Sequence, residues 1–78
     1  MPNPLYKVYN WHPNERTAWV KVVSTGQKAQ FMATLGGPVT LVKGTLDTGI
    51  NHALQLQLLA EFEDFYNNYI TTDKKWPY

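Results

Sequence analysis

The chain has 78 residues, of which 44% are hydrophobic, and a formal net charge of +1 from 7 Lys and Arg against 6 Asp and Glu. A chain of this length and apolar content indicates one folded domain of modest stability, not a disordered segment. The near-neutral charge gives no overall attraction to nucleic acid or anionic membrane, and the absence of cysteine excludes disulfides and thiolate metal sites.

The first two thirds of the chain predict four β-strands. Alternating, β-branched or aromatic residues mark strands at 5–11, 17–25, 28–35 and 39–46. Turn-forming residues separate them at 12–16, 26–27 and 36–38, and the 26–27 turn has a longer loop with a bulge as its alternative. Within the fourth strand, Gly44 is the expected position of a bulge or close backbone approach.

Residues 50–70 predict one long helix. Their apolar side chains fall within an arc of roughly 160°, as in a helix docked on a core. Asp47 or Thr48 is expected to cap its first turn. The sequence therefore predicts an α+β fold in which an antiparallel sheet of about four strands packs on one long C-terminal helix (ββββα). The whole chain, 1–78, is expected to form a single small domain with 1–4 and 71–78 as extended tails.

Strand alternation divides the predicted sheet into two faces. The face expected to contact the helix is apolar: Tyr6, Val8, Ala18, Val20, Val22, Ala29, Phe31, Ala33, Leu35, Val42 and Leu46. The opposite face carries lysines among aromatic residues: Lys7, Tyr9, Trp11, Trp19, Lys21, Val23, Lys28, Gln30, Met32, Lys43 and Thr45. A contiguous aromatic patch indicates a contact surface. The alternative is a stabilising Trp11–Trp19 cross-strand pair with lysine stems packed over the rings.

Two further segments have alternative interpretations. The tail 74–78 contains Trp76 after a basic pair, and it either folds back over an edge of the core or protrudes as a docking peptide. The polar helix face carries Glu61, Glu63 and Asp64, which indicates a solvated surface or an acidic docking surface for a basic partner.

The residues show no catalytic constellation. Neither His12 nor His52 has an Asp or Glu at the spacing that is typical of a metal-binding helix. Glu61 and Asp64 share a helix face, which does not supply the cleft that a carboxylate acid–base pair needs. Residues 36–38 precede a strand and lack the Gly-Lys-Ser/Thr of a phosphate loop. We therefore expect a protein that is not an enzyme and has no metal and no cofactor.

Residues 44–48, Gly-Thr-Leu-Asp-Thr, resemble the Gly-Thr-Phe-Asp-Thr signature of plant ethylene-response-factor DNA-binding domains. The resemblance implies a sheet that packs on one C-terminal helix and reads DNA through arginines and tryptophans of its strands. The resemblance is confined to residues 44–48, where Leu46 replaces phenylalanine. Of the DNA-contacting residues that it implies, the matching tryptophan is Trp19, and the sole arginine, Arg16, lies in a predicted turn. We assign no family on it.

The function favoured by the sequence is non-enzymatic protein binding by a small adaptor or inhibitor. Compact chains without motifs are frequent among phage and mobile-element accessory proteins that block host machinery. We expect such a protein in the cytoplasm and off the membrane. The alternatives are nucleic-acid binding by the same sheet face and a homodimer that buries it. The expected partner-binding residues are Tyr9, Trp11, Trp19, Lys21, Lys28, Met32, Lys43 and Trp76.

Overall fold

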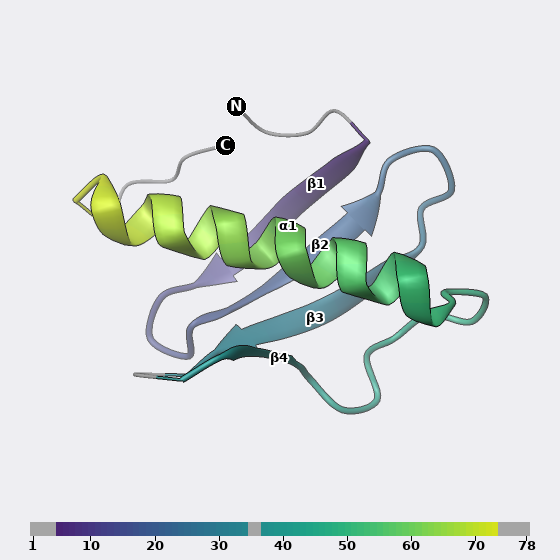
Figure 1. Cartoon of the computed structure of the whole chain (residues 1–78), viewed down its shortest axis with the longest axis horizontal. Coiled ribbons are helices and arrows are strands. Elements are labelled where there is room, and N and C mark those ends of the chain that lie inside the picture. The colour runs from purple at the N-terminus through teal and green to yellow at the C-terminus, as the bar shows by residue number, and fades with distance from the viewer. Residues whose placement is uncertain (1–4, 35–36, 74–78) are drawn as a thin grey trace.

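The computed structural model describes residues 5–34 and 37–73. Its elements are β1 (Tyr6–His12), β2 (Thr17–Val22), β3 (Lys28–Ala33), β4 (Val39–Leu41) and α1 (His52–Thr71). The strands form one antiparallel sheet in the order β1-β2-β3-β4, and α1 lies across one face of it (Figure 1). The α+β fold predicted from the sequence is therefore confirmed.

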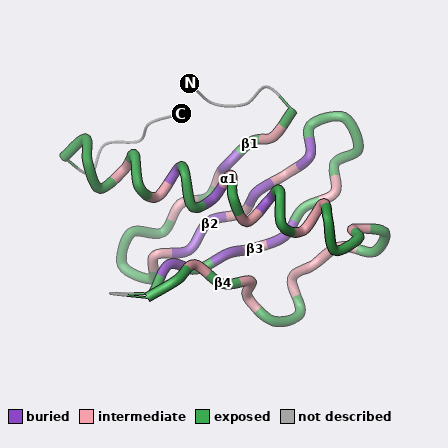
Figure 2. The backbone as a smooth tube through the Cα atoms, in the orientation of Figure 1, coloured by how far each residue is buried: buried purple, intermediate pink, exposed green. Residues whose placement is uncertain are grey.

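The hydrophobic core lies between α1 and the first three strands (Figure 2). Small and large side chains alternate in cross-strand register, with Ala18 opposite Phe31 and Val20 opposite Ala29, so the helix can approach the sheet closely. The ring of Phe62 stacks on Phe31 with centroids 6.0 Å apart. The buried apolar residues are Val8, Ala18, Val20, Val22, Ala29, Phe31, Ala33, Leu58, Phe62 and Phe65. The predicted inner face is thus confirmed for β1, β2 and β3, while Leu35 lies outside the described residues.

The connection between β2 and β3 is the longer of the two predicted alternatives. The Val22 amide donates to the Gln27 carbonyl at 2.8 Å, and the Gly26 amide donates to the Val22 carbonyl at 2.7 Å. Gly26 has a φ of 78°, a left-handed conformation that glycine adopts without steric cost. The loop closes at Val22, so β2 is shorter than the predicted strand.

The predicted fourth strand at 39–46 is wrong in length, because β4 ends at Leu41. A turn follows in which Gly44 has a φ of 83°, and nothing lies within 4 Å of a Cβ built at this position. The bulge or close backbone approach predicted for Gly44 within the strand is therefore wrong, because the strand has already ended. Beyond the turn, the Thr45 hydroxyl accepts from the Gln30 amide at 3.0 Å and substitutes for a ladder bond. Because Leu41 pairs with the inward-facing Phe31, Val42 points away from the core, which corrects its predicted place.

The N-cap of α1 is Asn51, not the predicted Asp47 or Thr48. The Asn51 side chain accepts from the Leu54 amide at 2.8 Å, as an N-cap side chain does for an otherwise unpaired donor. The Asp47 carboxylate instead accepts from the Lys28 amide at 3.0 Å, and the Thr48 carbonyl accepts from the Gln27 side chain. Asp47 therefore ties the loop to the sheet edge, and the helix begins later than the sequence predicted.

Candidate partner-binding surface

The sheet face opposite α1 is open, since no other described element covers it (Figure 1). Three lysines meet on this face in direct cross-strand register, with Lys7 opposite Lys21 and Lys21 opposite Lys28. We call Lys7, Lys21 and Lys28 the lysine row. The next row consists of Tyr9, Trp19 and Gln30, again in direct register, and we call its rings Tyr9 and Trp19 the aromatic pair.

The lysines lie over the neighbouring rings. The Lys21 ammonium is 5.6 Å from the centroid of the Tyr9 ring, and the Lys28 ammonium is 5.4 Å from that of Trp19. Each contact contributes about 0.5–1 kcal/mol at an exposed site. Tyr9 and Trp19 are partly exposed. The surface therefore presents ordered positive charge above a covered aromatic layer.

Three positive charges lie side by side in the lysine row. Like charges directly opposite one another on adjacent strands destabilise a sheet. Among the described residues, none of these three ammonium groups makes an ion pair with a carboxylate. The row also separates two apolar regions, because Leu5 and Val23, joined by a 3.0 Å backbone hydrogen bond, lie on its other side and are 62% and 55% exposed. An acidic partner would relieve the repulsion between the lysines.

The predicted place of Trp11 on this face is wrong. Asn10 has a φ of 53°, and the β1–β2 register shifts between Tyr9 and His12, so the strand bulges there. An extra residue inverts the alternation of side chains. The ring of Trp11 consequently lies on the helix side, 5.2 Å from Phe65 and 4.9 Å from Tyr69 between centroids. The cross-strand partner of Trp19 is therefore Tyr9, and no Trp11–Trp19 pair forms.

The remaining predicted site residues divide between the face and its surroundings. Met32 is 37% exposed and pairs with Thr17 and Thr40 one row beyond the aromatic pair, as predicted for the outer face. Lys43 is exposed but lies in the turn after β4, so its predicted place on the sheet is wrong. Trp76 lies outside the described residues.

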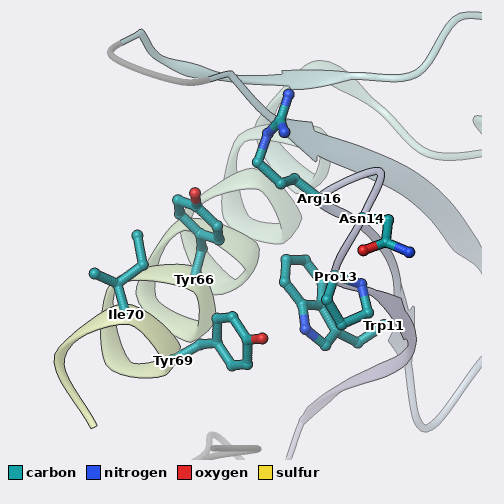
Figure 3. A pocket seen from close by; sticks show the side chains of 7 residues that line it. All are labelled: Trp11, Pro13, Asn14, Arg16, Tyr66, Tyr69 and Ile70. Atoms are coloured by element: carbon teal, nitrogen blue, oxygen red, sulfur yellow. The ribbon is translucent and has the colours of Figure 1, made fainter. Parts of the chain in front are cut away.

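A hollow that the sequence did not predict lies on the opposite side of the sheet, between the β1–β2 turn and the end of α1 (Figure 3). It brings Trp11 together with Arg16, Tyr66 and Tyr69. One feature of the sequence pointed to this hollow: Tyr66 and Tyr69 lie three residues apart on the apolar helix stripe. The missing information was the bulge that turns Trp11 toward them.

Within residues 5–34 and 37–73, no group of three or more His, Asp or Glu side chains gathers in a way that could hold a metal ion. The described part of the chain also has no helix that is both long enough and apolar enough to cross a bilayer. Comparison with protein-family models, with curated proteins and with solved structures finds no significant match.

Proposed function

We propose that the protein is a non-enzymatic binding module whose open sheet face docks an acidic protein partner. The observation that carries the proposal is the lysine row beside the aromatic pair, where repulsive charges and shielded rings occupy one continuous face. Residues at such a face that cost stability in the free protein are explained if a bound partner compensates them.

The covered rings favour a protein over a nucleic acid. A base stacks on an aromatic platform only if a ring face is free, and the lysine ammonium groups lie over Tyr9 and Trp19. Arginine usually supplies bidentate phosphate and base contacts. The sole arginine of the chain, Arg16, lines the hollow on the other side of the sheet.

The spacing of the charged and apolar residues on the face indicates what kind of partner surface would fit it. Adjacent strands lie about 4.8 Å apart, so the lysine row spans roughly 10 Å. Three acidic side chains on one helix face, each three or four residues after the last and about 5–6 Å from it, cover a similar length. Apolar side chains on both sides of those carboxylates would contact Leu5 and Val23 on one side and, on the other, the parts of Tyr9 and Trp19 that remain exposed. This partner surface is consistent with an adaptor or a stoichiometric inhibitor, such as an accessory protein of a phage or mobile element acting in a host cytoplasm.

The test begins with affinity capture from the native host and identification of the captured protein by mass spectrometry. Calorimetry with the purified partner then compares variants of the full chain. We expect Trp19→Ala to weaken binding by about 2 kcal/mol or more, the scale of an aromatic hot spot. Lys21→Gln should lower the association rate and its salt dependence, because it removes the centre of the row. Lys43→Gln removes the same charge outside the face and should leave binding unchanged.

Two outcomes would contradict this assignment. Micromolar binding to generic oligonucleotides, with a log–log salt slope near −3 that flattens on substitution of the lysine row, would identify a nucleic-acid-binding face. A dimeric mass in light scattering that becomes monomeric in Trp19→Ala would mean that a second copy of the chain covers the face.

A further inference from the structure

The hollow on the helix side of the sheet is an open pocket with a volume of about 310 Å³. Aromatic rings form its walls, and Figure 3 shows the rings of Tyr66 and Tyr69 from α1 facing the indole of Trp11 from β1. The exposed residues Pro13 and Asn14 lie at one end and the exposed Ile70 at the other. An extended chain could therefore enter and leave it. The full lining is Trp11, Pro13, Asn14, Arg16, Tyr66, Tyr69 and Ile70.

Among the described residues, the lining of the pocket includes a buried indole donor and an arginine, and no carboxylate. The Trp11 indole nitrogen is buried and has no hydrogen-bond partner among the described residues. A buried donor of this kind calls for an explanation, since nearly all such groups are paired in folded proteins. Arg16 uses its Nε to donate to the Ala33 carbonyl at 3.0 Å, which holds the side chain in place and leaves its terminal nitrogens for another acceptor. The matching ligand is rich in acceptors and carries negative charge.

Backbone strain lies at the same place. Asn10 and Arg16 have φ angles of 53° and 56°, in the left-handed region that residues other than glycine seldom occupy. The first belongs to the bulge that turns Trp11 toward the helix, and the second lies at Arg16, whose side chain lines the pocket. Asparagine tolerates this conformation, but arginine has no such preference. Strain of this kind is typical of ligand clamps and other functional sites.

We propose that this pocket binds an extended, proline-containing peptide segment that carries an acidic residue. Such a segment adopts the polyproline II conformation, whose carbonyl groups make no internal hydrogen bonds and remain available to donors. Its proline rings pack in grooves lined by aromatic side chains. The Trp11 indole donates to a backbone carbonyl, the prolines pack against Tyr66 and Tyr69, and Arg16 pairs with the carboxylate. This site is separate from the lysine face, because it lies on the opposite side of the sheet.

The direct test is a nuclear magnetic resonance titration of the ¹⁵N-labelled full chain. The probe is the synthetic peptide acetyl-Ala-Pro-Pro-Glu-Pro-Pro-Ala-amide. The indole signals of Trp11, Trp19 and Trp76 are assigned with single Trp→Phe variants. We expect the Trp11 signal to move on titration and the Trp19 signal, on the opposite face, to stay in place. This contrast keeps the test independent of the partner proposed for the lysine face.

Two peptide controls and two variants test the chemistry. A peptide with alanine at every proline position should bind at least about tenfold more weakly, because it loses both the ring contacts and the preformed backbone. Arg16→Asn removes the guanidinium and keeps a residue that tolerates the left-handed backbone, so the fold should persist. It should weaken binding of the Glu peptide about tenfold and leave a peptide with Gln in place of Glu almost unaffected. If the variant does not fold, the Glu-to-Gln exchange on the unaltered chain still measures the contribution of the charge. Lys21→Gln should change none of these affinities.

Several results would overturn the proposal. The Trp11 signal could stay in place at millimolar peptide, or the proline-free peptide could bind as tightly as the original. Acetate or benzoate alone could displace the peptide at equal concentration, which would identify a site for small acids. Movement of the Trp11 signal on raising the protein concentration without peptide would assign the pocket to a second copy of the chain.

Discussion

Replacement of Phe62 by alanine tests the packing of the core most directly. Phe62 has 0% exposure, and its ring contacts Phe31, Phe65 and Tyr66 at centroid distances of 6.0, 6.2 and 6.3 Å. Truncation removes these contacts and leaves a cavity between α1 and the sheet, which costs about 3–5 kcal/mol. A domain of 78 residues has an unfolding free energy of about 4–12 kcal/mol. The variant should therefore lose a large part of its stability.

The measurement is thermal unfolding followed by far-ultraviolet circular dichroism. At about 4–8 °C per kcal/mol for a domain of this size, the midpoint should fall by at least about 12 °C. Leu56→Ala on the same helix is the matched control, since Leu56 is 49% exposed and a surface change of this kind stays within about 0.5 kcal/mol. A Phe62→Ala midpoint within a few degrees of the parent chain would refute the docking of α1 through this face.

Three substitutions, two of them with a matched control substitution, test the local structure by chemical unfolding. Asn10→Val should cost about 1–2 kcal/mol, because a β-branched residue does not tolerate the left-handed bulge, whereas Asn10→Gly should stay near the parent chain. Asn51→Ala should cost about 1 kcal/mol as a lost N-cap. Thr48→Ala should stay within about 0.5 kcal/mol, since within the described part of the chain Thr48 is bonded through its carbonyl and not its side chain. Thr45→Val should cost about 1–3 kcal/mol and speed hydrogen exchange at the Gln30 amide, which loses its acceptor. Equal stability of all these variants would contradict the hydrogen bonds and turn geometry described above.

The sequence predicted the fold where one periodicity ran without interruption. The alternation of Val20 and Val22 with Trp19 and Lys21 held through β2, and the helical stripe placed Phe62 in the core. Both patterns are repeated over many residues, so a single local exception does not obscure them. The fold class followed from these two signals alone.

The boundaries were less predictable because several polar residues competed for the same role. Asp47, Thr48 and Asn51 are all good N-cap residues, and the choice depends on which of them the tertiary structure uses elsewhere. Asp47 is engaged by the Lys28 amide, a contact between residues far apart in the chain. Local sequence carries no information about that pairing, so the start of the helix was predicted too early.

The candidate site was likewise predicted only in part. The lysines and rings of β2 and β3 were placed on the correct face, since Trp19, Lys21 and Lys28 obey simple alternation. Their direct register with Lys7, and the position of the ammonium groups over the rings, depend on strand pairing and could not be read from the sequence. Trp11 was misplaced because an asparagine in the left-handed region looks no different in sequence from an asparagine in a strand.

The bulge at Asn10 decides how the aromatic residues of β1 are shared between the two surfaces. With regular alternation, Tyr9 and Trp11 would both face outward and extend the aromatic layer beneath the lysines. The bulge instead leaves Tyr9 on the lysine face and places the ring of Trp11 against the C-terminal end of α1. A substitution that abolished the bulge would therefore alter both surfaces at once. Trp19 and the lysine row on one side, and Arg16 on the other, each belong to one surface, so substitutions there test the two proposed binding sites separately.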